Sequence, residues 1–169
     1  MTTASESLIV RPAGVADVDR VAPLFDAYRQ FYDAAPDLAA ARTFLADRLT
    51  RGESVILLAC LEPSRRADAE EVIGFAQLYP SFSSLALGST IVLNDLFVAM
   101  AWRRHGVARR LLESVEAHAR TVGAAQIELA TQHTNLRALR LYEQRGYARD
   151  TEFVHLSRAV PRRVDTPCS

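Results

Sequence analysis

An apolar strand-like run that leads directly into an amphipathic helix is the feature that most restricts the fold of this chain. The run from Ser89 to Val98, STIVLNDLFV, is rich in apolar and β-branched residues, and a helical pattern begins at Gly106. From Ala108 onward, apolar residues recur at the spacing of a helix that packs one face against a sheet. A further strand pattern follows at 124–131. We therefore expect a β-α-β unit whose two strands run parallel.

Strand and helix patterns on either side of this unit indicate a mixed sheet flanked by helices. The sequence predicts an α/β (α+β) fold with a mixed, mostly antiparallel sheet of about six to seven strands and about four helices. The expected helices are 16–34, 38–52, 106–123 and 135–147. The expected strands are 7–12, 54–62, 71–81, 89–98 and 124–131, with one strand or two at 148–160.

Composition limits the class of protein. The 169 residues are 49% hydrophobic, which suits a single domain, expected over 8–160 between flexible tails at 1–7 and 161–169. The 20 basic and 20 acidic residues cancel, so no net field draws the chain to nucleic acid or to an anionic membrane. No apolar run approaches the roughly 20 residues that span a bilayer. Without metal-ligand spacing around its cysteines, the chain is predicted to be cytoplasmic and to bind no metal.

The helix that begins at Gly106 has no Ser, Thr, Asp or Asn to cap its first turn. Free N–H groups in that turn attract anions, and a small residue lets a phosphate approach the backbone closely. Arg103, Arg104 and Arg109 add positive charge around it. A strand-to-helix turn with solvated arginines accounts for the same residues equally well. The loop alone therefore leaves a phosphate site and a plain turn both open.

The spacing Arg103-x-x-Gly106-x-Ala108, placed after Leu96-Phe97-Val98, resembles the acetyl-CoA-binding segment of the GNAT superfamily of N-acetyltransferases. The order of elements resembles that family over nearly the whole chain, and LNDLFV resembles its polyamine and histone acetyltransferase branch. The resemblance implies the GNAT fold and acetyl-CoA as cosubstrate. It also implies cofactor contacts, mainly through backbone groups, at Phe97, Val98, Arg103, Arg104, His105, Gly106, Val107, Ala108, Arg109, Asn135 and Tyr142.

Asn135 and Tyr142 lie on one face of the last predicted helix. The residues alone leave Asn135 as a helix cap or a cofactor contact, and Tyr142 as a core aromatic or a functional hydroxyl. In GNAT enzymes a matching tyrosine often protonates the leaving thiolate, and the resemblance implies this role for Tyr142. A phenol with a pKa of about 10 and a thiol with a pKa of about 8.5 are well matched for that transfer.

Asp95 interrupts an apolar strand, where a carboxylate is costly unless it is paired or used. It is either a hydrogen-bonded structural residue or the group that orients the acceptor amine and takes its proton, directly or through water. The polyamine enzymes carry a glutamate one residue earlier, where this chain has Asn94. The resemblance places the acceptor site at Tyr28, Tyr32, Asp33, Tyr79 and Asp95.

The sequence thus predicts an N-acetyltransferase that moves acetyl from acetyl-CoA to a primary amine by direct attack in a ternary complex. The amine is a small amine, a polyamine or an amino-acid-like compound. No Cys or Ser lies in an activated setting, so no covalent acyl-enzyme is expected. The alternatives are a protein N-terminus or lysine acetyltransferase, a non-catalytic CoA-binding regulatory module, and a nucleotide-binding domain. Since the branch often dimerises through late strands and tails, we also expect a homodimer.

Overall fold

A computed structural model of the chain describes residues 7–62 and 70–160. Contacts along the chain divide it into two compact units, Met1–Ala130 and Thr131–Ser169. Within the described residues, the first unit contains a five-stranded sheet in the order β1-β2-β3-β4-β5 and three α-helices, and the second contains one α-helix. The predicted tails at 1–7 and 161–169 lie outside the described residues, except for Ser7.

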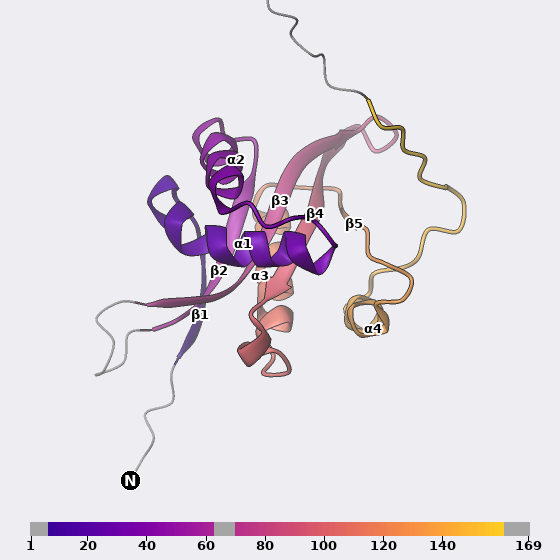
Figure 1. The fold of residues 1–169 in the computed structure, drawn as a ribbon. Helices are drawn as coiled ribbons and strands as arrows, with labels where there is room; N and C mark the ends of the chain where they lie inside the picture. Colours follow the sequence, from indigo (N-terminus) through magenta and orange to yellow (C-terminus); the bar gives the residue numbers. More distant parts are fainter. Residues whose placement is uncertain (1–6, 63–69, 161–169) are drawn as a thin grey trace, which may run out of the picture. The chain divides into compact units, whose positions relative to one another are not determined.

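The sheet is antiparallel over its first four strands and parallel over its last pair (Figure 1). This confirms the predicted β-α-β unit, because β4 and β5 run parallel on either side of a helix. β3 and β4 are longer than predicted and meet in a hairpin around the turn at 84–87. The strands are β1 (Leu8–Pro12), β2 (Val55–Leu61), β3 (Glu71–Ser83), β4 (Gly88–Val98) and β5 (Gln126–Leu129).

Helices cover both faces of this sheet (Figure 1). They are α1 (Val18–Phe31), α2 (Leu38–Thr50) and α3 (Val107–Thr121). Neighbouring residues of a strand point to opposite faces. On β3, Phe75 belongs to the apolar cluster that α1 and α2 form with the sheet, whereas a Cβ on Gly74 would lie 3.4 Å from Leu111 of α3. The sheet is thus enclosed between the α1–α2 pair and α3.

The apolar stripe predicted on the third helix is the buried face of α3. Leu111, Leu112 and Val115 have no exposed surface, and Val107 is buried with them. Burial of one such side chain stabilises the fold by about 1.5–3 kcal/mol. The packing of this stripe fixes the helix against the sheet, and with it the position of the loop that precedes the helix.

A β-bulge interrupts β4 near its middle. Gln77 of β3 is opposite Asp95, but the next residue, Leu78, is opposite Leu93, so Asn94 is the extra residue on β4. A bulge re-aims the side chains beside it. Asn94 is exposed, while Asp95 is buried on the sheet.

The prediction of one or two strands at 148–160 is wrong, and the sheet formed by the described residues has five strands instead of six or seven. The carboxylate of Asp150 accepts the N–H groups of Glu152 and Phe153 at 2.9 and 2.8 Å, which turns the chain at the start of this segment. Phe153, Val154 and Leu156 follow with exposed side chains. Apolar composition favours a strand, but a strand also requires a neighbour to pair with, and no described strand pairs with this segment.

The second unit contains α4 (Leu136–Gln144), which is somewhat shorter than the predicted helix. Among residues 7–62 and 70–160, no helix has the length and apolar character needed to cross a membrane.

Candidate active site

The turn between β4 and α3 is built from residues with unusual backbone conformations. After Val98 a short 3₁₀ turn, Met100–Trp102, precedes Arg104 at a φ of 71° and Gly106 at a φ of 80°. Gly106 is the N-cap of α3 and has no side chain with which to cap the helix, and apart from its neighbours in the chain no atom of the described residues lies within 4 Å of where its Cβ would stand. The first N–H groups of α3, which have no partner within the helix, therefore begin at an open, small residue.

Most of the predicted loop residues surround this helix end and are exposed. Arg104, His105 and Arg109 are exposed, and Arg109 Nε donates to Glu113 Oε1 at 3.1 Å. The Nδ1 atom of His105 lies 2.9 Å from the backbone oxygen of Arg103. The positive charge predicted around the helix end is present, and it increases the attraction for an anion that the helix end exerts.

Arg103 is held differently from the other two arginines. Its Nε donates to the backbone oxygen of Val98 at 3.0 Å, and its guanidinium lies 5.3 Å from the ring centroid of Phe97 and 5.8 Å from that of Phe31. These are cation–π contacts. Arg103 thus joins the end of α1 to the end of β4, and its side chain fixes the loop to the sheet.

The edge of β4 that faces β5 is paired over only part of its length. Pairing with β5 covers β4 from Thr90 to Leu93, whereas pairing with β3 continues to Val98. Beyond Leu93, no described strand covers the β5 side of β4. The backbone of Phe97 and Val98 therefore lies where an extended group can hydrogen-bond to the strand as an added strand does.

Asp95 lies on β4 directly after the bulge, in the stretch that β5 does not pair with, and the residue is 4% exposed. Its Oδ1 accepts from Asn94 Nδ2 at 3.0 Å, and the Tyr28 hydroxyl also donates to the carboxylate. Its Oδ2 has no hydrogen-bond partner in the part of the chain that the structure describes. Burial, which disfavours the charged form, raises the pKa of Asp95, although the two donors oppose the rise.

Aromatic residues of α1 pack beside Asp95. Tyr28 makes edge contacts with Phe97 at a centroid distance of 6.1 Å and with Tyr32 at 5.1 Å. Burial raises the pKa of the Tyr79 hydroxyl on β3 to about 12, and the nearby charge of Asp95 adds to this rise. The structure thus brings Tyr28 and Tyr79 to Asp95, with Tyr32 against Tyr28.

Asp33 is the predicted acceptor-site residue that stands apart from this cluster. It is exposed in the turn after α1, its φ is 61°, and its N–H donates to the backbone oxygen of Gln30 at 3.1 Å. In this position Asp33 helps to end the helix, because a left-handed residue at this point reverses the chain.

Gln77 was not predicted from the sequence, although it lies directly opposite Asp95 on β3. Its side chain has no exposed surface, and neither Oε1 nor Nε2 finds a hydrogen-bond partner among the described residues. The signal that could have found it is the one that identified Asp95: a polar residue inside an apolar strand, here GFAQL.

The second unit holds the other two predicted residues. Asn135 is the N-cap of α4, where its Oδ1 accepts the N–H of Ala138 at 3.3 Å and its Nδ2 donates to Thr131 Oγ1 at 3.4 Å. Tyr142 is half-buried, and its ring lies 5.8 Å from that of Tyr147. The capping role for Asn135 is confirmed, whereas the cofactor roles of both residues stay predictions.

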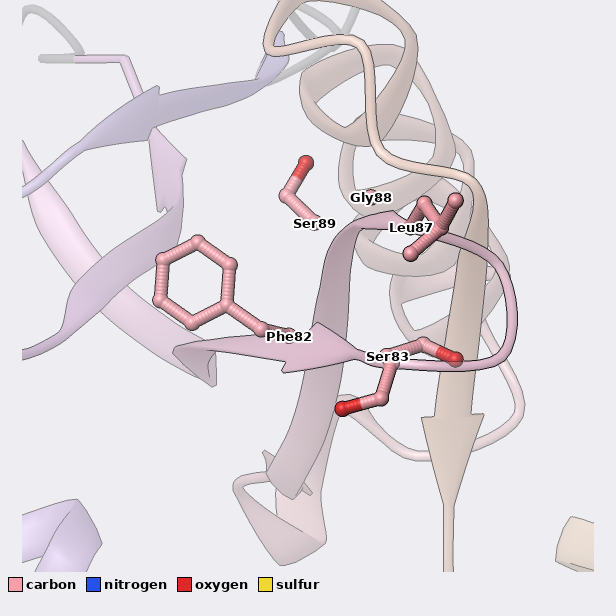
Figure 2. Close-up of a pocket in the computed structure, with 6 residues that line it drawn as sticks. Phe82, Ser83, Leu87, Gly88 and Ser89 are labelled. Atoms are coloured by element: carbon pink, nitrogen blue, oxygen red, sulfur yellow. The ribbon is translucent and has the colours of Figure 1, made fainter.

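A shallow hollow of about 450 Å³ lies at the far end of β4 from the loop, at the tip of the β3–β4 hairpin (Figure 2). It is lined by Phe82, Ser83, Ser84, Leu87, Gly88 and Ser89, and none of these side chains is ionisable at neutral pH. It therefore offers no acid or base for catalysis. Nor do three or more His, Cys, Asp or Glu side chains gather as metal ligands within the described ranges.

Comparisons with known proteins identify the family of the chain. Residues 21–147 match the Acetyltransferase (GNAT) family. The chain is 45% identical over 152 residues to the uncharacterized N-acetyltransferase YhfO of Bacillus subtilis (strain 168). The aligned region covers 90% of this chain and 97% of that protein. It is 34% identical over 80 residues to the D-amino-acid N-acetyltransferase HPA3 of Saccharomyces cerevisiae, covering 47% of this chain and 50% of that protein. A crystal structure of a probable acetyltransferase superposes with a TM-score of 0.81 at 37% identity, over 92% of this chain and 99% of that one.

Proposed function

The chain belongs to the acetyltransferase (GNAT) family and is an acyltransferase, and on that premise we propose that it acetylates the primary amine of a small molecule. The observation that carries the proposal of an acetyl-CoA-dependent reaction is the uncapped start of α3 at Gly106, next to a stretch of β4 that β5 leaves uncovered. Amino acids are the first class of acceptor to test, because the yeast relative is named for D-amino acids.

GNAT acetyltransferases use acetyl-CoA, which supplies an activated acetyl thioester when bound. The residues of the loop suit such a cosubstrate. The open space at Gly106 and the free N–H groups of α3 suit a pyrophosphate, and the arginines add positive charge. The uncovered backbone of Phe97 and Val98 suits an extended amide chain.

Two side chains are proposed to move protons. Asp95 orients the acceptor ammonium and takes its proton, and Tyr142 holds the proton that the departing thiolate needs. Support for Asp95 comes from its burial, from its aromatic surroundings, and from its Oδ2 atom, which has no hydrogen-bond partner among the described residues. Support for Tyr142 comes from its matching place on the last helix. Asn94 is exposed and, as an amide, cannot act as the base.

We further propose one catalytic domain over 8–160, a cytoplasmic location and a homodimer. The homodimer is supported by the resemblance to the polyamine and histone branch and by the exposed apolar side chains at Phe153 and Leu156. These proposals are separate from the chemistry, and none of the catalytic tests depends on them.

Calorimetry with acetyl-CoA, CoA and ATP tests the ligand class. We expect acetyl-CoA and CoA to bind and ATP to bind much more weakly, because the loop is proposed to recognise the pyrophosphate together with the pantetheine arm. Binding of ATP without binding of CoA would contradict the proposal and favour a nucleotide-binding domain.

Thiol release in the presence of candidate acceptors then tests the reaction. The panel contains D- and L-amino acids, diamines and polyamines, and peptides with a free N-terminus or lysine. Turnover with peptides alone would identify a protein acetyltransferase, and tight CoA binding without any turnover would favour a regulatory module.

Tyr142→Phe tests the proposed acid. We expect kcat to fall by roughly 10²–10⁴-fold while acetyl-CoA affinity changes little, because only proton donation is lost. Tyr147→Phe, which removes the hydroxyl of the neighbouring ring, is the matched control. Equal kcat values in the two variants would remove Tyr142 from the mechanism.

A further inference from the structure

We propose that Arg103 is a positioning residue that couples the two substrate sites, because its side chain links the loop before α3 to the end of α1 through Phe31. The inference rests on the proposed function, which places acetyl-CoA at that loop and the acceptor amine beside α1. The resemblance to the family implies a cofactor contact for Arg103, and it implies no link from this residue to α1.

The side chain of Arg103 is held by three contacts. Its Nε donates to the backbone oxygen of Val98 at 3.0 Å, and its guanidinium carbon lies 5.3 Å from the ring centroid of Phe97. The same carbon lies 5.8 Å from the ring centroid of Phe31, the last residue of α1. Both rings are within the roughly 6 Å over which a cation and an aromatic face attract each other. One side chain therefore joins the loop, the end of β4 and the end of α1.

Aromatic side chains continue the path from Arg103 along the acceptor side of the sheet. Phe31 makes an edge contact with Tyr32 at a centroid distance of 5.1 Å, and Tyr32 makes one with Tyr28 at 5.1 Å. Tyr28 in turn contacts Phe97 at 6.1 Å. Since Arg103 contacts both Phe31 and Phe97, the five side chains form a closed ring of contacts. Arg103 is the member of this ring that comes from the loop.

The ring of contacts reaches the proposed proton acceptor at one side and solvent at the other. The Tyr28 hydroxyl donates to the carboxylate of Asp95. Phe31 is 52% exposed and Tyr32 is 38% exposed, so the ring of contacts has an open aromatic surface. Aromatic faces attract ammonium groups. A shift at the end of α1 therefore changes the surface that an acceptor amine meets beside Asp95.

The other two arginines of the loop are placed differently. Arg104 and Arg109 are exposed, and Arg109 Nε donates to Glu113 Oε1 on the same helix at 3.1 Å. Their side chains can turn toward an anion without disturbing α1. Arg103 is half-buried between two rings. Arg103 thus belongs to the cosubstrate loop by its backbone and to the acceptor side by its side chain.

A residue shared in this way couples the two ligands. A cosubstrate that fixes the loop also fixes Arg103 and the end of α1, so the acceptor meets a surface that is already ordered. Such coupling is reciprocal, because the acceptor must raise the affinity for the cosubstrate by the same factor. A partly exposed cation–π contact changes an equilibrium constant by roughly two- to fivefold, and we expect a coupling of that size.

The first test examines the contact itself and uses no ligand. The Nε–H signal of Arg103 in a proton–nitrogen NMR spectrum is assigned by its loss in Arg103→Lys. We expect this signal to exchange slowly with water, because the group donates to Val98, and to be displaced by the ring currents of Phe97 and Phe31. The displacement should shrink in Phe31→Leu, which removes a ring and keeps an apolar side chain. A rapidly exchanging signal, or one that Phe31→Leu leaves unchanged, overturns the proposal.

The second test measures the affinity for CoA by calorimetry. Phe31→Leu should weaken CoA binding roughly two- to fivefold, although Phe31 belongs to α1 and not to the loop. Phe44→Leu on α2 is the matched control, because its ring also lies against a guanidinium, that of Arg48 at 5.4 Å. Phe44→Leu should lower Tm and leave the affinity for CoA unchanged. An unchanged CoA affinity in Phe31→Leu, or an equal loss in Phe44→Leu, overturns the coupling.

A double-mutant cycle shows whether Phe31 acts through Arg103. Arg103→Lys keeps the charge and removes the planar guanidinium, which is not a conservative change at a stacked site. In the Arg103→Lys background, Phe31→Leu should have little further effect on CoA affinity. Losses that add in full would mean that the two residues act independently, and would contradict the proposal.

The third test looks for crossed effects in turnover, with the amine of the acceptor panel that reacts fastest. Arg103→Lys, on the loop, should raise the KM of the amine roughly two- to fivefold at saturating acetyl-CoA, with a smaller change in kcat. An effect of Arg103→Lys confined to the KM of acetyl-CoA overturns the coupling. Failure of the proposed function is seen separately, because the native protein would then bind no CoA or acetylate no amine. In that case the contact between Arg103 and Phe31 is structural, and the coupling is rejected with the function.

Discussion

Asp95 combines a buried carboxylate with too few donors to satisfy it, and this has a measurable consequence for stability. Burial raises its pKa in the folded protein. A carboxyl group with a raised folded pKa contributes stability at pH values below its unfolded pKa, and that contribution is lost as pH rises through the folded pKa. Ionisation of this carboxyl group is therefore a cost to folding at pH values above its unfolded pKa.

Asp95→Asn should consequently be more stable than the native protein at pH 7, with a higher Tm, while its acetyl transfer falls by roughly 10²-fold or more because the proton acceptor is gone. Melting curves from pH 4 to pH 8 should show the advantage in Tm growing with pH. Activity and stability are thus expected to change in opposite directions at this residue.

Asp26→Asn is the matched control, because Asp26 is also buried but its surroundings lower its pKa, whereas those of Asp95 raise it. The N–H of Asp37 and the side chains of Arg29 and Gln30 lower its pKa. Its carboxylate therefore stabilises the fold above the unfolded pKa, and that stability is lost as pH falls through the folded pKa. We expect Asp26→Asn to lower Tm at pH 7, and equal Tm changes in the two variants would contradict the assignment.

The two polar residues of the β3–β4 pair show how far sequence reasoning reaches at this scale. Asp95 stood out because a charge in an apolar strand is costly, and the structure does bury it. Gln77 met the same criterion and was missed, because a neutral amide in a strand is a weaker signal and its meaning depends on the residue opposite. That partner is set by the bulge at Asn94, which no local pattern in the sequence specifies.

At the scale of elements, the turn before α3 should bind its ligand through backbone N–H groups, so its conformation matters more than its side chains. Gly106 has a φ of 80°, and a side chain there is strained even though the space is open. We expect Gly106→Ala to lose about 1–2 kcal/mol of stability. It should also lose acetyl-CoA affinity at least several-fold by calorimetry, because the added methyl group projects into the space proposed for the pyrophosphate.

Gly123→Ala provides a control at the other end of the same helix. Gly123 has a φ of 68° with equally open surroundings, but lies after the C-terminus of α3. The strain and the loss of Tm should be similar in the two variants, and acetyl-CoA affinity should change only in Gly106→Ala. A parallel loss of affinity in both would mean that the helix as a whole, and not its first turn, supports binding.

Each of the predicted helices is present, because a helix carries its start signals in local residues. Asp37 caps α2 and Asn135 caps α4 through side-chain bonds, and Gly106 precedes α3. The segment 148–160 had a strand-like composition but no partner within the described sheet. Pairing is a non-local property, so composition could not decide it.

At the scale of the whole molecule, the sequence was sufficient for the family because several weak features occur in one order along the chain. The loop motif alone was compatible with a plain turn. Together with the parallel β4–β5 pair and the match over residues 21–147, it identifies the fold. The order of these features along the chain does not identify the acceptor. The acceptor depends on the side chains around Asp95, and these stand on a scaffold that other members of the family share.

The proposed homodimer is the remaining property of the whole molecule, and the exposed apolar side chains of 153–160 offer a way to test it. Light scattering at several concentrations should give twice the mass of one chain for the native protein. Leu156→Asp should reduce it to that of one chain, because Leu156 is 92% exposed and an apolar side chain at an interface cannot be replaced by a charge without cost. Leu85→Asp, at a residue 91% exposed in the β3–β4 turn, is expected to stay dimeric. A native protein with the mass of one chain at every concentration would contradict the dimer, and a dimeric Leu156→Asp would place its interface elsewhere.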